Sequence, residues 1–171
     1  FSNLMASNPI GKMMSQMVLG IHPKRKVPKF VRQTFSKWFK ARGAGNAQAT
    51  NTVVLLNDTY MNYNYPEIGK AAVALLEAAG LKVVLSETKC CGRPMISKGL
   101  LDDATANAVS NVDQLYAFAE AGIPVVGCEP SCLLTFRDEY PQLVRDERAK
   151  KVAENSFMID EFLMKLQEDG K

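Results

Sequence analysis

Closely grouped cysteines are the residues in this sequence with the most distinctive chemistry. Cys90 and Cys91 are adjacent and precede Gly92, and Cys128 and Cys132 follow later in the chain. Their thiolates could bind a soft metal or attack a disulfide. The backbone must turn for two adjacent side chains to reach one site, and a glycine supports such a turn. Four cysteines in 171 residues are too few for a disulfide framework, which favours a reducing compartment, the cytoplasm.

Two carboxylates complete a candidate ligand set. Asp58 follows the first apolar run of the chain, and Glu129 stands shortly before Cys132. The sulfurs of Cys90, Cys91 and Cys132 with one carboxylate would satisfy four-coordinate zinc, whereas a cubane iron–sulfur cluster usually requires four thiolates. The expected metal ligands are these three cysteines with Asp58 and Glu129. Soft thiolates select zinc, copper(I) or iron–sulfur clusters, and we expect an iron–sulfur cluster or zinc here.

Positive charge flanks the adjacent cysteines. Lys89 and Arg93 stand on either side of the pair, and nearby cations favour the thiolate form. The planar guanidinium of Arg93 could bind a carboxylate-bearing ligand or Glu129, so both residues are assigned to cofactor binding. Cys128 is as readily an ordinary buried cysteine, and its participation stays open. A disulfide within the adjacent pair is disfavoured by strain.

Strands and helices must bring these residues together. Apolar runs at 53–56, 82–85 and 124–127 are typical of buried strands, and amphipathic stretches at 66–79 and 99–121 predict connecting helices. With a further helix after the third strand, the order βαβαβα predicts a three-layer α/β fold with a small parallel sheet. The carboxyl ends of parallel strands share one edge, so the polar residues after each strand should form one site.

Two segments are less regular in pattern. Residues 57–65 are dense in hydrogen-bonding and aromatic groups and are predicted to form a loop. Residues 144–166 predict one or two helices, and a fourth strand is left open.

Charge divides the chain into two parts. Residues 1–57 hold nine Lys or Arg and no Asp or Glu, whereas residues 58–171 hold twelve basic and eighteen acidic residues. Small polar residues at 43–50 are typical of a linker. We therefore expect a basic helical arm or interdomain segment at 1–42, a linker at 43–50, and an α/β domain with C-terminal helices at 51–171.

Aromatic residues recur at helical spacing within the arm. An amphipathic helix could face a membrane or a nucleic acid, but docking of its aromatic face on the neighbouring domain is favoured. We expect no nucleic-acid partner, and membrane association is not favoured because the chain has no apolar run of about 18 residues. The aromatic and apolar positions are Phe30, Val31, Phe35, Trp38 and Phe39.

Three motifs resemble a known family. Cys-Cys-Gly-Arg-Pro at 90–94, Glu-Pro-Ser-Cys at 129–132 and the spacing from Asp58 resemble the cysteine-rich CCG domain over roughly residues 50–145. That domain occurs in the B subunit of heterodisulfide reductase, the C subunit of anaerobic glycerol-3-phosphate dehydrogenase, the iron–sulfur subunit of glycolate oxidase and lactate-utilisation proteins. The longer stretch at 90–102 is most similar to the C-terminal region of FAD-linked oxidases of the D-2-hydroxyglutarate or D-lactate dehydrogenase type.

The chain departs from the complete family pattern. Asp58 and Glu129 stand where the full cysteine set has thiols, and Cys128 is one residue out of register. The resemblance implies a noncubane iron–sulfur cluster or zinc in members with every cysteine, so the cluster type here stays open. One CCG repeat instead of two implies a fragment of a parent whose second repeat lies elsewhere.

The resemblance implies electron transfer within a larger oxidoreductase. In the parent, FAD would oxidise a D-2-hydroxy acid, and flavin and ferredoxin-like domains of the same chain would be the partners of this domain. FAD is not expected in this fragment, because no glycine-rich dinucleotide motif is present, and the isolated domain is expected to be inactive. Two alternatives are a docking or structural module with zinc or no metal, and a thiol–disulfide redox site.

Overall fold

Four parallel strands form the centre of the molecule, for which a computed structural model describes residues 3, 8–43, 45–46 and 49–168. The strands lie in the order β2-β1-β3-β4, so β1 and β3 occupy the middle of the sheet. Neighbouring strands are in parallel register, with Val54 paired to Val84 and to Val125. The bounds are Asn51–Leu55 for β1, Leu81–Leu85 for β2, Val125–Gly127 for β3 and Ser156–Met158 for β4.

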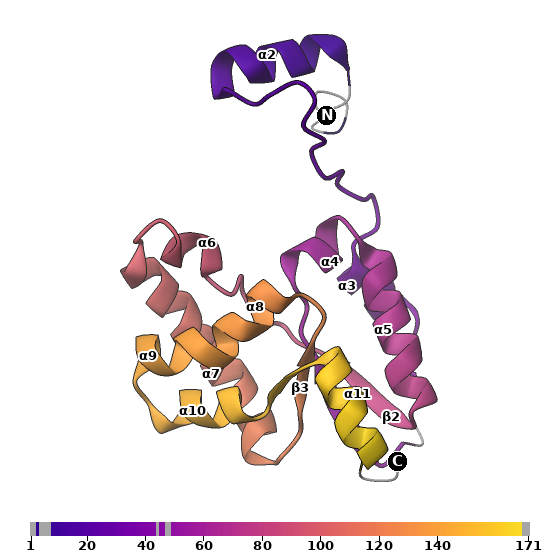
Figure 1. Ribbon diagram of the computed structural model, residues 1–171. Helices are drawn as coiled ribbons and strands as arrows, with labels where there is room; N and C mark the ends of the chain where they lie inside the picture. Colours follow the sequence, from indigo (N-terminus) through magenta and orange to yellow (C-terminus); the bar gives the residue numbers. More distant parts are fainter. Residues whose placement is uncertain (1–2, 4–7, 44, 47–48, 169–171) are drawn as a thin grey trace.

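Helices cover both faces of this sheet, which gives the predicted three-layer α/β fold (Figure 1). Helices α5 (Pro66–Ala78) and α11 (Ile159–Glu168) lie on one side. Helix α7 (Leu101–Glu120) lies on the other side with the helices that follow β3. Those are α8 (Pro130–Leu134), the π-helical turn η1 (Thr135–Glu139), α9 (Tyr140–Val144) and α10 (Glu147–Glu154).

Local sequence explains where the connecting helix α5 begins and ends. Pro66 occupies the first turn, where its missing N–H costs nothing, and Glu67 complements the positive end of the helix dipole. The chain leaves the helix through Gly80, whose φ of 80° lies in the left-handed region. Buried Ala72, Val73 and Leu76 fix its inner face against the sheet.

The structure differs from the sequence prediction at residues 57–65, and at residues 144–166 it contains the fourth strand that the prediction left open. The predicted loop at 57–65 contains the helix α4 (Thr59–Tyr63), because the Asp58 carboxylate caps its amino end. The C-terminal segment contains the fourth strand β4 between α10 and α11, and Val125 N donates a hydrogen bond to Asn155 O beside it. A single-turn helix, α6 (Arg93–Ile96), follows the adjacent cysteines after Gly92, which is its N-cap.

The basic arm contains two described helices, α2 (Pro9–Leu19) and α3 (Phe35–Ala41). The expected helix from Phe30 begins only at Phe35, because Thr34 caps it by accepting a hydrogen bond from Lys37 N. Phe35 is fully buried and packs in the same cluster as β1 and α5, while α2 lies apart from the sheet (Figure 1). Residues 1–2 and 4–7 of the arm, 44 and 47–48 of the expected linker, and 169–171 lie outside the described residues.

Among the helices that the structure describes, none combines the length and apolar character needed to cross a bilayer.

Candidate functional site

Two cysteines from distant parts of the chain meet at the carboxyl edge of the sheet. Cys91 lies in the segment that leads from β2 into α6, and Cys132 lies in the first turn of α8, which follows β3. Their Sγ atoms are 3.3 Å apart and hydrogen-bonded. Cys91 is only 3% exposed, whereas its neighbour Cys90 is exposed. The predicted convergence of strand-end residues therefore includes these two sulfurs.

A turn at Gly92 sets the positions of the adjacent cysteines. Its φ of 88° lies in the left-handed region, which a residue with a Cβ adopts only at a cost. The same turn begins α6, and Gly92 packs against Ala104 of α7. Cys90 is exposed and Cys91 is buried, and the Cys90 thiol is within hydrogen-bonding reach of Cys91.

The environment shifts the pKa values of the two paired thiols in opposite directions. Hydrogen bonding from Cys132 lowers the pKa of Cys91 to about 7, even though burial opposes this, and the Arg93 amide and Cys90 contribute in the same direction. The shared hydrogen bond, burial and Glu129 raise the pKa of Cys132. Cys91 is therefore the more acidic thiol of the hydrogen-bonded pair.

Glu129 is held at the amino end of α8. Its Oε2 accepts a hydrogen bond from Cys132 N at 2.6 Å, so the carboxylate occupies the position where the helix dipole favours negative charge. The carboxylate also adds negative charge beside the thiols of Cys91 and Cys132. Glu129 thus lies beside the sulfur pair.

Asp58 occupies the corresponding position after β1. Its carboxylate accepts a hydrogen bond from Met61 N at 2.8 Å and caps α4. Burial raises the pKa of this carboxyl, and the charge of Glu129 acts in the same direction. Asp58 lines a cavity of about 710 Å³ together with Cys90, Cys91 and Cys132, so it shares an opening with the sulfurs.

Arg93 and Cys128 lie differently from Glu129 and Asp58. The guanidinium of Arg93 forms an ion pair with Glu139 of η1, and no pairing of Arg93 with Glu129 appears among the described residues. Cys128 packs in the cluster on the α5 face, opposite to the cluster that contains Cys91. Burial, with the charge of Asp58, raises the pKa of Cys128 to about 11. Cys128 is therefore a protonated thiol on the opposite face of the sheet.

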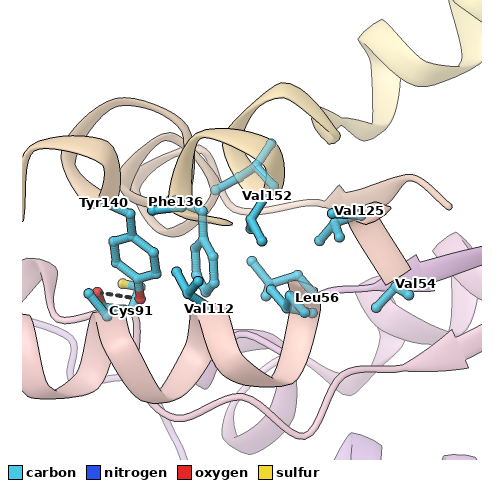
Figure 2. Packing of buried hydrophobic residues seen from close by; sticks show 13 residues of the cluster. Val54, Leu56, Cys91, Val112, Val125, Phe136, Tyr140 and Val152 are labelled. Atoms are coloured by element: carbon cyan, nitrogen blue, oxygen red, sulfur yellow. Dashed lines mark hydrogen bonds between the residues drawn. The ribbon is translucent and has the colours of Figure 1, made fainter. Parts of the chain in front are cut away.

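A buried polar network supports the cysteine turn, and the sequence prediction missed it. Asn111 of α7 accepts a hydrogen bond from Lys89 N at 2.8 Å and donates to the Cys90 carbonyl at 3.4 Å. Tyr140 of α9 donates to the Cys91 carbonyl at 3.0 Å (Figure 2). The only sequence signal was one polar residue on the apolar face of α7, at Asn111, which is fully buried.

These donors fit a thiolate metal centre in part. In the described part of the chain, no group of three or more His, Cys, Asp or Glu side chains is arranged to hold a metal ion. The separation of 3.3 Å between the Cys91 and Cys132 sulfurs is nevertheless close to the roughly 3.7 Å between two thiolates on one tetrahedral zinc. Cys90 and Glu129 line one cavity of about 560 Å³ together with this sulfur pair.

Known proteins share this chain's sequence pattern. The C subunit of anaerobic glycerol-3-phosphate dehydrogenase from Escherichia coli (strain K12) is 32% identical over 94% of this chain and 41% of its own length. D-2-hydroxyglutarate dehydrogenase of Pseudomonas putida is 31% identical over 62% of this chain and 10% of its own length. Lactate utilization protein A of Halalkalibacterium halodurans is 34% identical over 58% of this chain and 41% of its own length. No solved structure matches the chain.

The matched family model covers the sheet edge with both paired sulfurs. It extends from the first residue of α4 to η1 and includes the adjacent cysteines, Glu129 and Cys132. Its description is a cysteine-rich domain. The role of these relatives is oxidoreductase-related, as the names of the two dehydrogenases state. Residues 59–137 of this chain therefore belong to the CCG family of cysteine-rich domains.

Proposed function

We propose that this domain holds a cysteine-based metal or redox centre that transfers electrons within a larger FAD-linked oxidoreductase. The observation that carries the proposal is the 3.3 Å contact between the sulfurs of Cys91 and Cys132, which come from elements on either side of β1. The carboxylate of Glu129 beside them adds a fourth donor to the three grouped thiols. Such a soft donor set is suited to iron–sulfur clusters or zinc.

Each residue has a defined part in holding that centre. Cys91 and Cys132 are the central ligands, Cys90 supplies a third sulfur from the solvent side, and Glu129 supplies an oxygen. Asp58 lines the shared cavity and is a further oxygen ligand in the proposal. An iron–sulfur cluster, when bound, supplies one-electron chemistry, whereas zinc would make the site structural or Lewis-acidic.

Arg93 tunes charge at this centre from its ion pair with Glu139. The backbone amide of Arg93 also hydrogen-bonds to the Cys91 sulfur. Arg93 thereby links the charge at the edge of the site to the backbone of the cysteine turn.

The proposed partners are flavin and ferredoxin-like domains that pass electrons from a D-2-hydroxy acid. The dehydrogenase names of two relatives support this assignment, and the chain covers well under two thirds of each relative's length. Four unpaired cysteines are compatible with a reducing compartment, which we propose to be the cytoplasm.

Metal and sulfide analysis with an absorption spectrum tests the proposal. The chain is purified without oxygen and compared with Cys91→Ser and with Cys128→Ser, which removes a thiol on the other face of the sheet. We expect bound metal in the wild type and in Cys128→Ser, and its loss in Cys91→Ser. Iron with sulfide identifies an electron-carrying cluster, and stoichiometric zinc identifies a structural or Lewis-acidic site.

Two results would contradict the metal centre. Absence of metal from all three proteins would favour a docking module, particularly if Cys91→Ser unfolds at the same denaturant concentration as the wild type. Equal metal loss in both serine variants would place the ligands elsewhere.

A thiol–disulfide site is the second candidate function. The sulfurs of Cys91 and Cys132 already lie 3.3 Å apart, and a pKa of about 7 provides a thiolate at Cys91. Oxidation would join the two sulfurs with loss of two protons and two electrons to a disulfide or quinone-class oxidant. Titration of the metal-free chain in glutathione buffers, followed by mass spectrometry of the trapped thiols, tests this candidate. A reversible mass change confined to Cys91 and Cys132 would support it.

A further inference from the structure

One segment of the basic arm lies directly beside the cysteine site. The Val31 amide donates a hydrogen bond to the Tyr63 carbonyl at 2.8 Å, and Asn64 of the chain after α4 donates to the Lys29 carbonyl at 2.9 Å. These contacts fix the segment against α4. Val27 and Phe30 then line a cavity of about 560 Å³ that Cys90, Cys91 and Cys132 also line. Arm and thiols therefore border one opening.

This segment presents an exposed surface with both apolar and charged groups. Val27 is 43% exposed and Phe30 is 54% exposed, although each borders the cavity. The basic residues around them are also exposed, and none takes part in an ion pair among the described residues. We name this surface the arm face, and it comprises Lys24, Arg25, Lys26, Val27, Lys29 and Phe30.

No acidic residue in the arm offsets the positive charge of the arm face. Residues 1–57 contain no Asp or Glu, so every charge within the arm is positive. Acidic groups at the site are engaged elsewhere, since Glu129 caps α8 and Glu139 pairs with Arg93. A basic rim around exposed aromatic and aliphatic groups is suited to an acidic protein surface with an apolar centre.

We propose that the arm face is the docking surface for an acidic one-electron carrier protein or domain, which exchanges electrons with the cysteine centre. This inference rests on the proposed function, because docking here places the carrier next to Cys90, the exposed cysteine. An iron–sulfur centre held by Cys90, Cys91 and Cys132 would supply one-electron chemistry, so it would accept the single electron that the reduced carrier gives up. The basic residues steer and orient the carrier, and Val27 and Phe30 exclude water from the contact.

An acidic carrier protein and an anionic lipid surface would contact different apolar groups of the arm. The arm face borders a cavity, and a protein surface can project into that opening. A bilayer would instead take up the exposed apolar face of α2, which carries Ile10, Met13, Met14, Met17 and Val18. Val27 and Phe30 lie outside that helix, at the thiols. The position of the apolar groups therefore favours the protein carrier.

Calorimetric titration of the 171-residue chain with a plant-type ferredoxin, a small acidic [2Fe–2S] carrier, tests the proposal. The titration is made at low salt and at about 300 mM NaCl with the wild type, with Lys26→Glu/Lys29→Glu, and with Lys82→Glu/Lys151→Glu. The last variant changes the net charge equally. Its lysines are exposed and lie in β2 and α10, away from the arm face.

The expected result is binding at low salt that weakens at least about tenfold at high salt and about tenfold in the arm-face variant. The β2 and α10 variant should bind within about twofold of the wild type. Equal binding by both charge variants, or no ferredoxin binding at low salt, overturns the inference. Binding to phosphatidylglycerol vesicles without binding to ferredoxin overturns it in favour of a lipid surface.

The same titration with Cys91→Ser separates this inference from the proposed function. Docking by this variant is expected to persist, because the arm face contains no metal ligand. If the chain docks but no form of it contains metal, the electron-transfer function is contradicted. The arm face would then remain a docking surface for an acidic protein. A chain that contains an iron–sulfur cluster but does not dock contradicts only the docking surface.

Discussion

The Asn111 side-chain amide donates a hydrogen bond of 2.8 Å to the Tyr140 hydroxyl, so α7 and α9 share a fully buried polar contact. The Tyr140 hydroxyl in turn donates a hydrogen bond to the Cys91 carbonyl. Burial raises the pKa of the Tyr140 hydroxyl, which therefore stays protonated and able to donate. Its ring packs on Phe136 with centroids 4.4 Å apart (Figure 2). The position of Cys91 thus depends on two helices distant from it in sequence.

Tyr140→Phe is expected to destabilise the fold while keeping the ring contact with Phe136. The change removes the donor to the Cys91 carbonyl and leaves the buried Asn111 amide without one acceptor. An unsatisfied buried polar group costs about 1–3 kcal/mol. Urea unfolding measures this cost. The control is Tyr116→Phe, whose hydroxyl donates to Glu120 at the surface and should be worth far less. Equal stability losses in the two variants would rule out a special role for the buried network.

The thiols on the two faces of the sheet are expected to ionise at different pH values, Cys91 near pH 7 and Cys128 near pH 11. In the reduced, metal-free chain, ultraviolet absorbance of thiolate should rise through pH 7, because Cys91 has a pKa of about 7. Cys91→Ser should remove this step. Cys128→Ser should leave the step unchanged, because burial holds the pKa of Cys128 at about 11. A step that survives Cys91→Ser would assign the low pKa to a different cysteine.

Asp58→Asn is expected to change how stability depends on pH. Burial raises the pKa of Asp58 from 3.8 in the folded state, so its favourable contribution is present below 3.8 and is lost as pH rises through the folded pKa. Asparagine still caps α4 and carries no charge. The stability of the variant relative to the wild type should therefore increase from about pH 3 to neutral pH, as measured by thermal unfolding.

Asp146→Asn is the control of opposite sign. Asp146 also caps a helix, α10, but the Arg148 amide and side chain lower its pKa from 3.8. Its favourable contribution is present above 3.8 and is lost as pH falls. The stability of this variant relative to the wild type should decrease as pH rises. Parallel pH profiles for the two variants would contradict the assignment of Asp58 as a buried carboxyl.

Patterns with a clear period predicted the sheet and its main helices from sequence. The valine-rich runs form β1, β2 and β3 in the structure. Pro66 and Gly80 correctly indicated where α5, the helix between β1 and β2, begins and ends. The predicted meeting of strand-end residues extends to Cys91, Cys132 and Glu129 because parallel strands fix that edge.

Features built from short elements and distant contacts escaped prediction. Helix α4 has five residues and strand β4 has three, too few for a periodic pattern to stand out. The contact of Tyr140 with Cys91 joins residues 49 positions apart, and no local rule links them. The pairing of Arg93 with Glu139 depends in the same way on how η1 packs beside the site.

Phe35→Ala is expected to destabilise the α/β fold strongly although Phe35 stands within the basic arm. Its ring is fully buried, packs in a cluster with β1 and α5, and stacks on Trp38 with centroids 5.7 Å apart. Removing a buried phenylalanine costs about 3–5 kcal/mol, measured by urea unfolding. Phe30→Ala, at a side chain 54% exposed, should change stability by less than about 0.5 kcal/mol. A loss for Phe35→Ala as small as that for Phe30→Ala would mean that α3 contributes nothing to the domain core.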